Sequence, residues 1–380
     1  MPFQRLQNDR ETAARLGRLD TPHGTVHTPV FMPVGTRATV KGMTPRDLEE
    51  LGCEILLGNT YHLALRPGIE IVEDAGGLHR FMHWRRPILT DSGGYQVFSL
   101  AALRKVTSRG VHFQSHIDGT PLFLGPSEAM DIQRRLGSDI AMVFDECTHY
   151  PCTRDEAQSS LALTLAWARE CRKQPRAEGQ QVFGIVQGAL FRDLREHAAR
   201  ELAALDFDGY AVGGLSVGEE EKAMLEVLDW TTPLLPADRA RYLMGVGTPP
   251  QIVRAVARGV DMFDCVLPTR LGRNGTAFTA EGSIPVKAGR FRRDFRPVDE
   301  SCSCYACRHF SRAYIRHLIN MNEMLAARLL TLHNLHFYLR LMETARRHIR
   351  QGTFAAFAEA FCQRYDSHEP ENEGAETDHA

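Results

Sequence analysis

Acidic and amide side chains follow several short apolar runs of this chain, at the points where parallel strands would end. A pair of carboxylates can act as nucleophile and as general acid or base in substitution at a sugar carbon. Aspartate and glutamine can also read the donor and acceptor edges of a purine. Because the carboxyl ends of parallel strands meet on one rim, we expect these side chains to converge: Asp91, Asp145, Gln187 and Asp264.

Each of these residues also has an ordinary structural interpretation. Asp91 could cap the turn that follows it, Asp145 could pair with an arginine, and Asp264 could be a polar residue at a strand end. Tyr95 and Met244 are more often packing residues than ligand contacts. The convergence of polar groups and glycines at successive strand ends favours the functional interpretation, because glycines let a flat ligand touch backbone amides.

A second group of residues has the types and spacing of a metal site. Cys302, Cys304 and Cys307 form a C-x-C-x-x-C motif, and His333 follows in a segment with a helical pattern. Three thiolates and an imidazole are a set that Zn²⁺ takes in closed structural sites, so we expect one structural zinc ion per chain. His336 is an alternative ligand on nearly the same helix face. Free thiols in a loop are the other interpretation.

The elements that must position these residues can be read from the apolar pattern. Continuous apolar runs fit strands that are buried on both faces, as in a parallel sheet. Helical patterns lie between most of the runs, at 156–173, 190–205 and 251–258, and Thr44 with Asp47 begins another helix. We expect an α/β fold of the (β/α)8 TIM-barrel type, or alternatively a doubly wound open sheet, from eight candidate strands: 30–34, 54–57, 87–90, 140–144, 182–186, 210–212, 242–244 and 260–263.

Two stretches interrupt this rhythm and suggest a division into domains. Residues at about 104–124 have β-rich flanks around glycine turns and predict hairpins inserted into the barrel. We expect a barrel over 1–272, a zinc-binding subdomain over 273–339, a C-terminal helix over 340–365 that packs on the barrel, and a disordered acidic tail over 366–380.

Composition narrows the class of protein. The 380 residues are 43% apolar and 24% charged, as in globular proteins, and the formal net charge is −2. A polyanionic partner would therefore have to meet a local basic patch. The chain has no apolar run of about 18 residues and no signal-peptide pattern, so we expect no membrane span. Nine cysteines without an export signal predict reduced thiols in the cytoplasm.

Five ordered motifs resemble those of the tRNA-guanine transglycosylase family, and the resemblance covers nearly the whole chain. The cysteine cluster with His333 matches the family pattern too. The resemblance implies a barrel with a zinc-binding subdomain, which exchanges guanine at the anticodon wobble position for a 7-deazaguanine on the way to queuosine. The motifs are DSGGYQV at 91–97, FDEC at 144–147, VQG at 186–188, GGLSVGE at 213–219 and DMFDCVLPTR at 261–270.

The resemblance also implies roles for residues of the rim. Asp264 would be the nucleophile that forms a covalent tRNA intermediate, and Asp91 the general acid and base, so that two displacements retain configuration. Tyr95 and Met244 would sandwich the base, a stacking contribution of roughly 1–3 kcal/mol. The substrate-binding residues implied are Asp145, Gln187, Gly213, Gly214, Leu215, Tyr95, Met244, Ser92 and Val217.

Substrates and partners follow from the same resemblance. Arg270 and Arg273 would hold the anticodon phosphates, with solvated loop arginines as the alternative. The implied partners are tRNAs with a G-U-N anticodon, which are those for aspartate, asparagine, histidine and tyrosine, with guanine and 7-aminomethyl-7-deazaguanine as small ligands. We expect a homodimer, because tRNA is larger than one barrel face.

The pocket residues distinguish between types of transglycosylase. Val217 and Cys147 resemble the bacterial type, which takes 7-aminomethyl-7-deazaguanine. A valine at 217 fills the space that the cyclopentenyl group of queuine, the base of the eukaryotic type, would need. The archaeal type is disfavoured, because the chain ends soon after the zinc-binding subdomain. A non-catalytic, zinc-stabilised tRNA-binding subunit and a nucleoside hydrolase stay open as alternatives.

Overall fold

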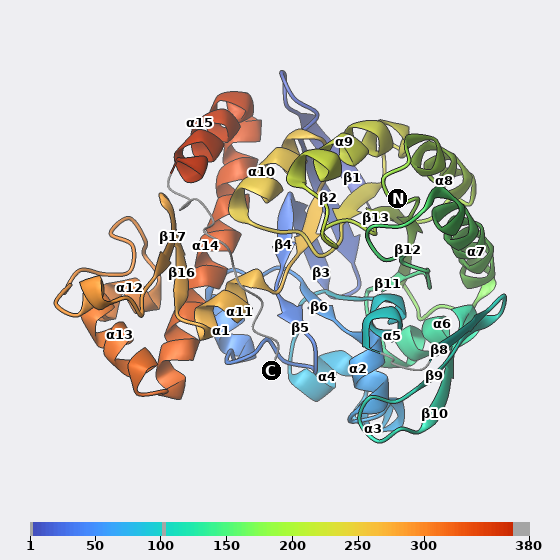
Figure 1. Ribbon diagram of the computed structural model, residues 1–380, viewed down its shortest axis with the longest axis horizontal. Coiled ribbons are helices and arrows are strands. Elements are labelled where there is room, and N and C mark those ends of the chain that lie inside the picture. The colour runs from blue at the N-terminus through green and yellow to red at the C-terminus, as the bar shows by residue number, and fades with distance from the viewer. Residues whose placement is uncertain (1–2, 101–103, 368–380) are drawn as a thin grey trace.

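The computed structural model describes residues 3–100 and 104–367, and a closed parallel barrel forms its centre (Figure 1). The first barrel strand is split at Pro33 into two halves, one paired with the last strand and the other with the second. Every predicted apolar run overlaps a barrel strand, so the barrel is confirmed and the open sheet is wrong. The strands are β4 (Val30–Met32) with β5 (Val34–Gly35), β6 (Leu56–Gly58), β7 (Ile88–Thr90), β11 (Ile140–Met142), β12 (Gln181–Val186), β13 (Gly209–Val212), β14 (Ala240–Leu243) and β15 (Met262–Asp264).

Helices connect successive strands and cover the outside of the barrel (Figure 1). The predicted start at Thr44 is a capping box, in which Asp47 donates its N–H to the Thr44 hydroxyl at 3.2 Å and its carboxylate accepts the Thr44 N–H at 2.8 Å. Thr153 and Glu156 form the same box at α7. The helices are α1 (Pro45–Glu50), α2 (Thr60–Leu65), α3 (Ile69–Asp74), α4 (Leu78–Met82), α5 (Gly94–Leu100), α6 (Pro126–Leu136), α7 (Arg154–Lys173), α8 (Arg192–Ala204), α9 (Glu221–Thr231), the 3-10 turn η1 (Thr232–Leu234) and α10 (Pro249–Ala257).

The core lies between the barrel strands and these helices. All six residues of β12 are buried, as the continuous apolar run requires. The rings of Phe31, Phe144, Phe183 and Phe263 are fully buried. Burying each ring contributes roughly 1.5–3 kcal/mol, so the strand ends rest on a rigid scaffold.

Two antiparallel sheets are added to the barrel. A sheet of β1 (Phe3–Asn8), β2 (Arg15–Thr21) and β3 (Gly24–Thr28), which the sequence analysis did not predict, lies at the N-terminal ends of the barrel strands. It is fixed there by bonds such as that from Arg15 to Asp261. Within the predicted hairpin insertion the chain forms β8 (Arg104–Thr107), β9 (Gly110–Gln114) and β10 (Pro121–Leu124), which pair in an antiparallel manner.

The remaining elements form a lobe beside the barrel, to the left in Figure 1. α14 is one continuous helix that crosses the expected boundary between 339 and 340, and the proposed division into domains stays a prediction. The expected tail lies outside the described residues from 368 onward. Among the described helices, none is both long and apolar enough to cross a membrane. The elements are α11 (Leu267–Arg273), β16 (Thr276–Thr279), β17 (Gly282–Pro285), η2 (Gly289–Phe291), α12 (Tyr305–His309), α13 (Arg312–Asn320), α14 (Met324–Gln351) and α15 (Phe354–Asp366).

Candidate active site and metal centre

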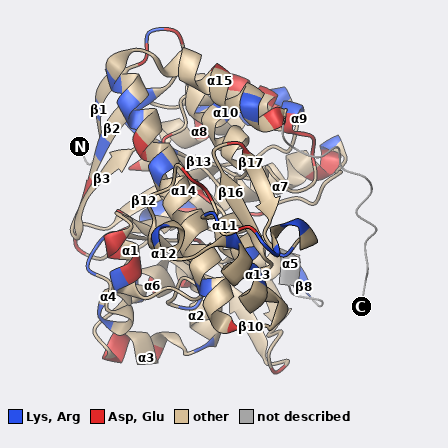
Figure 2. Ribbon diagram, turned by 90° about the vertical axis from the view of Figure 1, so that its left-hand side faces the viewer, with Lys and Arg blue, Asp and Glu red and all other residues tan. Residues whose placement is uncertain are grey.

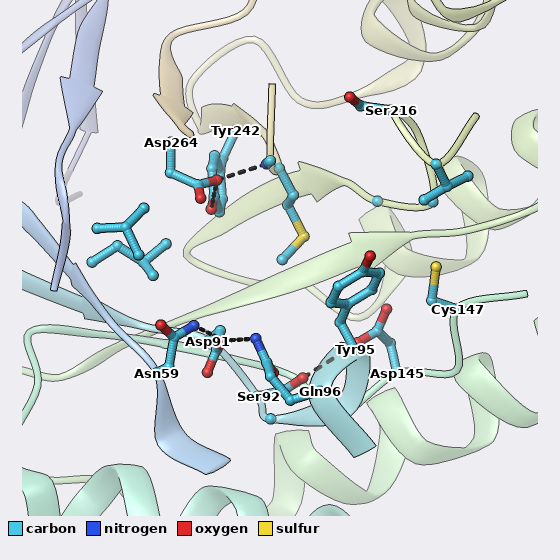
Figure 3. Close-up of a pocket in the computed structure, with 18 of the residues that line it drawn as sticks. Asn59, Asp91, Ser92, Tyr95, Gln96, Asp145, Cys147, Ser216, Tyr242 and Asp264 are labelled. Atoms are coloured by element: carbon cyan, nitrogen blue, oxygen red, sulfur yellow. Dashed lines mark hydrogen bonds between the residues drawn. The ribbon is translucent and has the colours of Figure 1, made fainter. Parts of the chain in front are cut away.

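The C-terminal ends of the barrel strands enclose a cavity of about 380 Å³ (Figure 3). Every residue that was predicted to act in catalysis or base binding lines this cavity. The structure therefore brings these side chains together, while their individual roles stay predictions. They are Asp91, Ser92, Tyr95, Asp145, Gln187, Gly213, Gly214, Leu215, Val217, Met244 and Asp264.

Asp264 ends strand β15 and lines the cavity with its carboxylate. Its Oδ1 atom accepts hydrogen bonds from the Tyr242 hydroxyl at 2.5 Å and from the Gly245 N–H at 2.7 Å (Figure 3). Among the described residues, no other residue donates to Oδ2, so this oxygen is available to a ligand. Burial raises the pKa of Asp264, and the bonds from Tyr242 and Gly245 oppose that shift. A carboxylate with one anchored and one free oxygen is suited to act as a nucleophile.

Asp91 follows β7 and is buried among three donors. Its Oδ2 atom accepts from Asn59 Nδ2 at 2.5 Å and from Gln96 Nε2 at 2.8 Å, and its Oδ1 accepts from the Thr60 N–H at 2.8 Å. Burial raises the pKa of Asp91 to about 6, the hydrogen bonds lower it, and the negative charge of Asp264 raises it further. A pKa near neutrality suits a group that both gives and takes a proton.

Asp145 follows β11 and lies across the cavity from Asp264 in the view of Figure 3. Gln187 donates Nε2 to its Oδ2 at 2.7 Å, and Ser92 donates Oγ to its Oδ1 at 3.3 Å. Burial raises the pKa of Asp145 to about 6, and these two bonds lower it. A carboxylate next to an amide presents acceptors and a donor side by side, as the edge of a purine requires.

The glycines beyond β13 are required by close packing. A Cβ atom on Gly213 would lie 2.7 Å from Gln187 Nε2, and one on Gly214 would lie 2.4 Å from Gln187 Oε1. Gly214 also has φ +64°, which a side chain would strain. In the following loop, the Glu219 carboxylate accepts the N–H groups of Ser216 and Val217, the latter at 2.9 Å. This loop is therefore held by its own bonds, with Val217 in the cavity wall.

Arg270 and Arg273 do not line the cavity but lie on α11, directly after Asp264. Arg273 donates Nη1 to the Thr269 carbonyl at 2.9 Å, and Arg270 is exposed. Within the described part of the chain, neither guanidinium forms an ion pair with a carboxylate. Figure 2 shows basic and acidic residues spread over the surface, so any binding of a polyanion depends on local groups such as these.

The sequence analysis missed the groups that hold the two catalytic candidates. Asn59 and Gln96 stand in polar segments at strand ends, so their positions carried a signal that was not used. Tyr242 gave no signal, because it lies inside an apolar strand and only the fold shows that its hydroxyl reaches Asp264. A backbone donor such as the Gly245 N–H cannot be recognised from residue type at all.

The predicted metal ligands form a compact cluster. The Sγ atoms of Cys302, Cys304 and Cys307 lie 3.6, 3.6 and 3.3 Å from Nδ1 of His333. A zinc ion bound tetrahedrally, with Zn–S of about 2.3 Å and Zn–N of about 2.0–2.1 Å, would place sulfur and nitrogen about 3.6 Å apart. His333 Nε2 lies 2.7 Å from the Phe278 carbonyl, which accepts its proton and leaves Nδ1 as the ligand atom. The cluster could hold a metal ion, and the ligand set fits zinc.

His336, the alternative fourth ligand, fits this cluster less well. It approaches Cys302 at 3.5 Å but lies outside the set of four ligand atoms that come within 4.8 Å of one another. All nine cysteines are free thiols, so none is withdrawn from the cluster by a disulfide.

A second group of residues with side chains that can bind metals lies at the end of the barrel opposite the cavity. It consists of His23, His79 and Asp139. The two imidazole rings stack 3.6 Å apart at an angle of 13°. His23 Nδ1 contacts one Asp139 oxygen at 2.8 Å and His79 Nε2 contacts the other at 3.1 Å. Because the parallel rings point to separate oxygens and do not converge on one point, we interpret this group as a hydrogen-bonded network.

These features define a class: a (β/α)8-barrel protein with a carboxylate-lined cavity at its C-terminal rim and a separate cluster of three thiols and an imidazole that could hold a metal ion. Comparison with known proteins gives the family. The profile of the family described as queuine tRNA-ribosyltransferase matches residues 9–367. The chain belongs to this family, and it is therefore a pentosyltransferase.

Similar curated proteins carry the same name. The queuine tRNA-ribosyltransferase of Pelotomaculum thermopropionicum is 59% identical over 96% of this chain and 98% of its own length. That of Moorella thermoacetica is 56% identical over 96% and 98%. The enzyme of Bacillus subtilis is 55% identical over 97% of each chain.

Proposed function

We propose that this chain is a tRNA-guanine transglycosylase, which replaces guanine at the wobble position of G-U-N tRNAs with 7-aminomethyl-7-deazaguanine. The observation that carries the proposal is that a buried carboxylate, Asp91, and a partly buried one, Asp264, share one cavity with groups suited to a purine edge. Membership of a family named for transfer of a base to tRNA ribose supports it.

The first displacement uses both carboxylates. The free Oδ2 of Asp264 attacks the anomeric carbon of the target nucleotide, and the bond from this carbon to guanine breaks. Asp91 supplies the proton that the departing base takes up, and a covalent ester joins Asp264 to the ribose. Tyr242 and Gly245 hold Oδ1 during the attack. With a pKa of about 6, Asp91 has both its protonated and its ionised form accessible near neutral pH, so it can give a proton and take one back.

The second displacement reverses these roles. The incoming base gives its ring N–H proton to the Asp91 carboxylate, and its nitrogen attacks the same anomeric carbon. The ester bond breaks and the Asp264 carboxylate is restored. Two inversions at one carbon give net retention, as in retaining glycosidases.

The base would be recognised by residues on the side of the cavity that lies across from Asp264. Asp145 would accept from the amino and ring N–H groups of the base, and Gln187 and the Gly214 N–H would reach its carbonyl oxygen. The Leu215 carbonyl would accept from the aminomethyl group. Because Val217 also lines the cavity, its side chain occupies space that a larger substituent would need.

Binding of tRNA requires contacts beyond the cavity. Arg270 and Arg273 would hold phosphates next to the target nucleotide, since their guanidinium groups have no carboxylate partner within the described residues. We place a second copy of the chain against the lobe beside the barrel, where Met321 and Met324 are 58% and 87% exposed. The reaction would take place in the cytoplasm, where the tRNA substrate is made.

The metal centre would hold one zinc ion per chain in a structural role. Cys302, Cys304, Cys307 and His333 would bind it, and together they fill a tetrahedral set. When bound, zinc supplies a cross-link between the cysteine segment and α14. The cluster lines no part of the catalytic cavity, which supports a purely structural role.

Incorporation of labelled guanine tests the proposed activity. The enzyme is incubated with an unmodified tRNA-Tyr transcript and, as a control, with a transcript whose wobble guanine is replaced by adenine. We expect label in the first transcript alone. Intact tRNA binding without incorporation would instead favour the non-catalytic subunit, and release of free guanine without uptake would favour the hydrolase.

A further inference from the structure

Arg195 carries a buried charge that forms no ion pair with any carboxylate in the described part of the chain. It lies on α8, and its side chain is 0% exposed. A buried guanidinium costs several kcal/mol unless its protons are fully bonded. The groups that accept hydrogen bonds from Arg195 should therefore show what this buried guanidinium does in the fold.

All the partners of Arg195 are backbone carbonyl groups at the rim of the barrel. Nη1 donates to Val186 and to Gly213, both at 2.8 Å, and Nη2 donates to Gly214 at 3.4 Å. Nε donates to Ala189 at 2.7 Å. The planar fork of one guanidinium thus joins the C-terminal ends of β12 and β13, which are adjacent in the barrel.

These bonds fix the direction of two amide groups in the cavity wall. In a trans peptide the carbonyl and the following N–H point in opposite directions. Because the Gly213 carbonyl points to Arg195, the Gly214 N–H points away from it, and the Gly214 carbonyl orients the Leu215 N–H in the same way. Gly214 and Leu215 both line the cavity, so an N–H group that points away from Arg195 can meet a ligand there.

The same loop packs against the side-chain amide of Gln187, the residue proposed to contact the base. A Cβ atom on Gly214 would lie 2.4 Å from Gln187 Oε1 and 3.6 Å from Arg195 Nη2, so both side chains occupy the space on the side of this glycine where a side chain would point. Gln187 in turn donates to Asp145 at 2.7 Å. A continuous set of contacts therefore runs from Arg195 to the carboxylate that faces the base.

We propose that Arg195 is a positioning residue for base recognition, which sets the Gly213–Gly214 peptide so that its N–H meets the carbonyl oxygen of the bound purine. Arg195 does not line the cavity and touches no substrate itself. This inference rests on the proposed function, because it assigns the ligand of the loop as the exchanged base.

The test compares Arg195→Lys with Arg241→Lys. Arg241 is a matched control, because it is also a buried arginine that donates to a backbone carbonyl, that of Leu235 at 3.0 Å, and burial lowers the pKa of both arginines to about 10. It lies at the N-terminal end of β14, away from the cavity. The measurements are KM for guanine, KM for tRNA and kcat in guanine exchange, together with the unfolding midpoint of each variant.

We expect Arg195→Lys to raise KM for guanine by about tenfold or more, because the compact ammonium group of lysine cannot reproduce the planar fork that reaches four carbonyl groups. KM for tRNA should stay within about twofold, since the loop N–H groups that Arg195 positions are assigned to the base and not to the RNA backbone. Arg241→Lys should lower the unfolding midpoint and leave KM for guanine unchanged. Added guanidinium should restore guanine binding in Arg195→Ala.

Several results would overturn the proposal. An unchanged KM for guanine in folded Arg195→Lys would do so, as would equal increases in both variants. If neither Arg195 variant folds while Arg241→Lys does, Arg195 determines the fold and has no separate positioning role. Failure of the wild type to exchange guanine would instead refute the proposed function, so the two failures are distinguishable.

Discussion

Buried aspartates are held in opposite ways at the two ends of the same barrel strand. Asp139 directly precedes β11 at its N-terminal end, and Asp145 lies just beyond its C-terminal end. Burial raises the pKa of Asp139, but hydrogen bonds from two histidines and from backbone N–H groups outweigh it and lower the pKa. For Asp145, burial dominates over bonds from two side chains, and the pKa rises to about 6.

Strand β15 shows the same contrast. Asp261, next to its N-terminal end, accepts two bonds from Arg15, at 3.0 and 2.6 Å, and the Arg241 N–H at 2.7 Å. Asp264, at the other end, has one oxygen bonded to Tyr242 and Gly245 and the other directed to the cavity.

The difference separates stability from chemistry within one barrel. A buried carboxylate whose hydrogen bonds outweigh the cost of its burial contributes to the fold, whereas one whose burial cost prevails destabilises the fold and is retained for a ligand or a reaction. This division agrees with the location of activity at the C-terminal face of such barrels.

The sharpest test of this division replaces one carboxylate oxygen by an amide nitrogen at each end of β15. Asp264→Asn should lower base exchange by at least about 10⁴-fold, because the amide is not a nucleophile. No protein–tRNA adduct should appear on a denaturing gel. The unfolding midpoint should stay near that of the wild type, since an amide oxygen can still accept from Tyr242. Adduct formation by this variant would reject Asp264 as the nucleophile.

Asp261→Asn is the matched change at the other end of the strand. It leaves the buried Arg15 charge without its partner, which costs about 3–5 kcal/mol. Urea unfolding should show this loss, while the folded fraction keeps its exchange rate within about twofold. A large loss of rate in folded Asp261→Asn would break the division between the two ends.

The metal centre extends the comparison to the lobe beside the barrel. Like Asp139, the cysteine cluster lies away from the cavity, and its four ligands would complete the coordination of one zinc ion, so loss of the ion should affect stability more than chemistry. Cys304→Ala should reduce bound zinc from about one ion per chain to almost none and lower the unfolding midpoint by roughly 5–10 °C. Metal analysis that finds no zinc in the wild type would reject this structural role.

The contrast between the strand ends also explains what could be predicted from the sequence. The barrel could be predicted, because its strands are continuous apolar runs such as that of β12. Asp91, Asp145 and Asp264 could be predicted, because polar residues that directly follow such runs must lie on one rim. The antiparallel sheet β1–β3 was missed, because its alternating and exposed pattern resembles a polar loop.

Groups that act through another residue could not be predicted. Arg195 lies in the first turn of an amphipathic helix, where an arginine normally faces solvent, and its burial depends on the carbonyls of two strands brought together by the fold. The Tyr242 hydroxyl extends from an apolar strand to Asp264 in the neighbouring strand, and sequence patterns do not encode that pairing.

Stability measured against pH should differ in sign between the two ends of β11. The pKa of Asp139 is lower in the folded state, so its stabilisation is present at neutral pH and is lost as the pH falls through that pKa. The pKa of Asp145 is raised from 3.8 to about 6, so its contribution is full below pH 3.8 and is lost as the pH rises through about 6.

Urea unfolding of two variants between pH 4 and pH 8 tests these signs. Asp139→Asn should be less stable than the wild type by a nearly constant amount across this range, because the pKa of Asp139 lies below 3.8 and its stabilisation is lost only in more acid solution. Asp145→Asn should be more stable than the wild type at pH 8, by up to about 2–3 kcal/mol, and the gain should disappear near pH 4. Parallel pH profiles for the two variants would show that the two ends of the strand do not differ.

The smallest expected effect concerns shape at the C-terminal rim. Val217 lines the cavity, and its N–H is held by Glu219 at 2.9 Å, so its side chain occupies a fixed place in the wall. Val217→Gly should allow queuine to be incorporated, with a gain of about tenfold or more over the wild type, because an apolar pocket discriminates by roughly 1–3 kcal/mol. Val217→Ala should give a smaller gain, and use of the aminomethyl base should change little in either variant. Competition between labelled queuine and guanine measures this choice, and no gain in Val217→Gly would mean that charge and not shape selects the base at this rim.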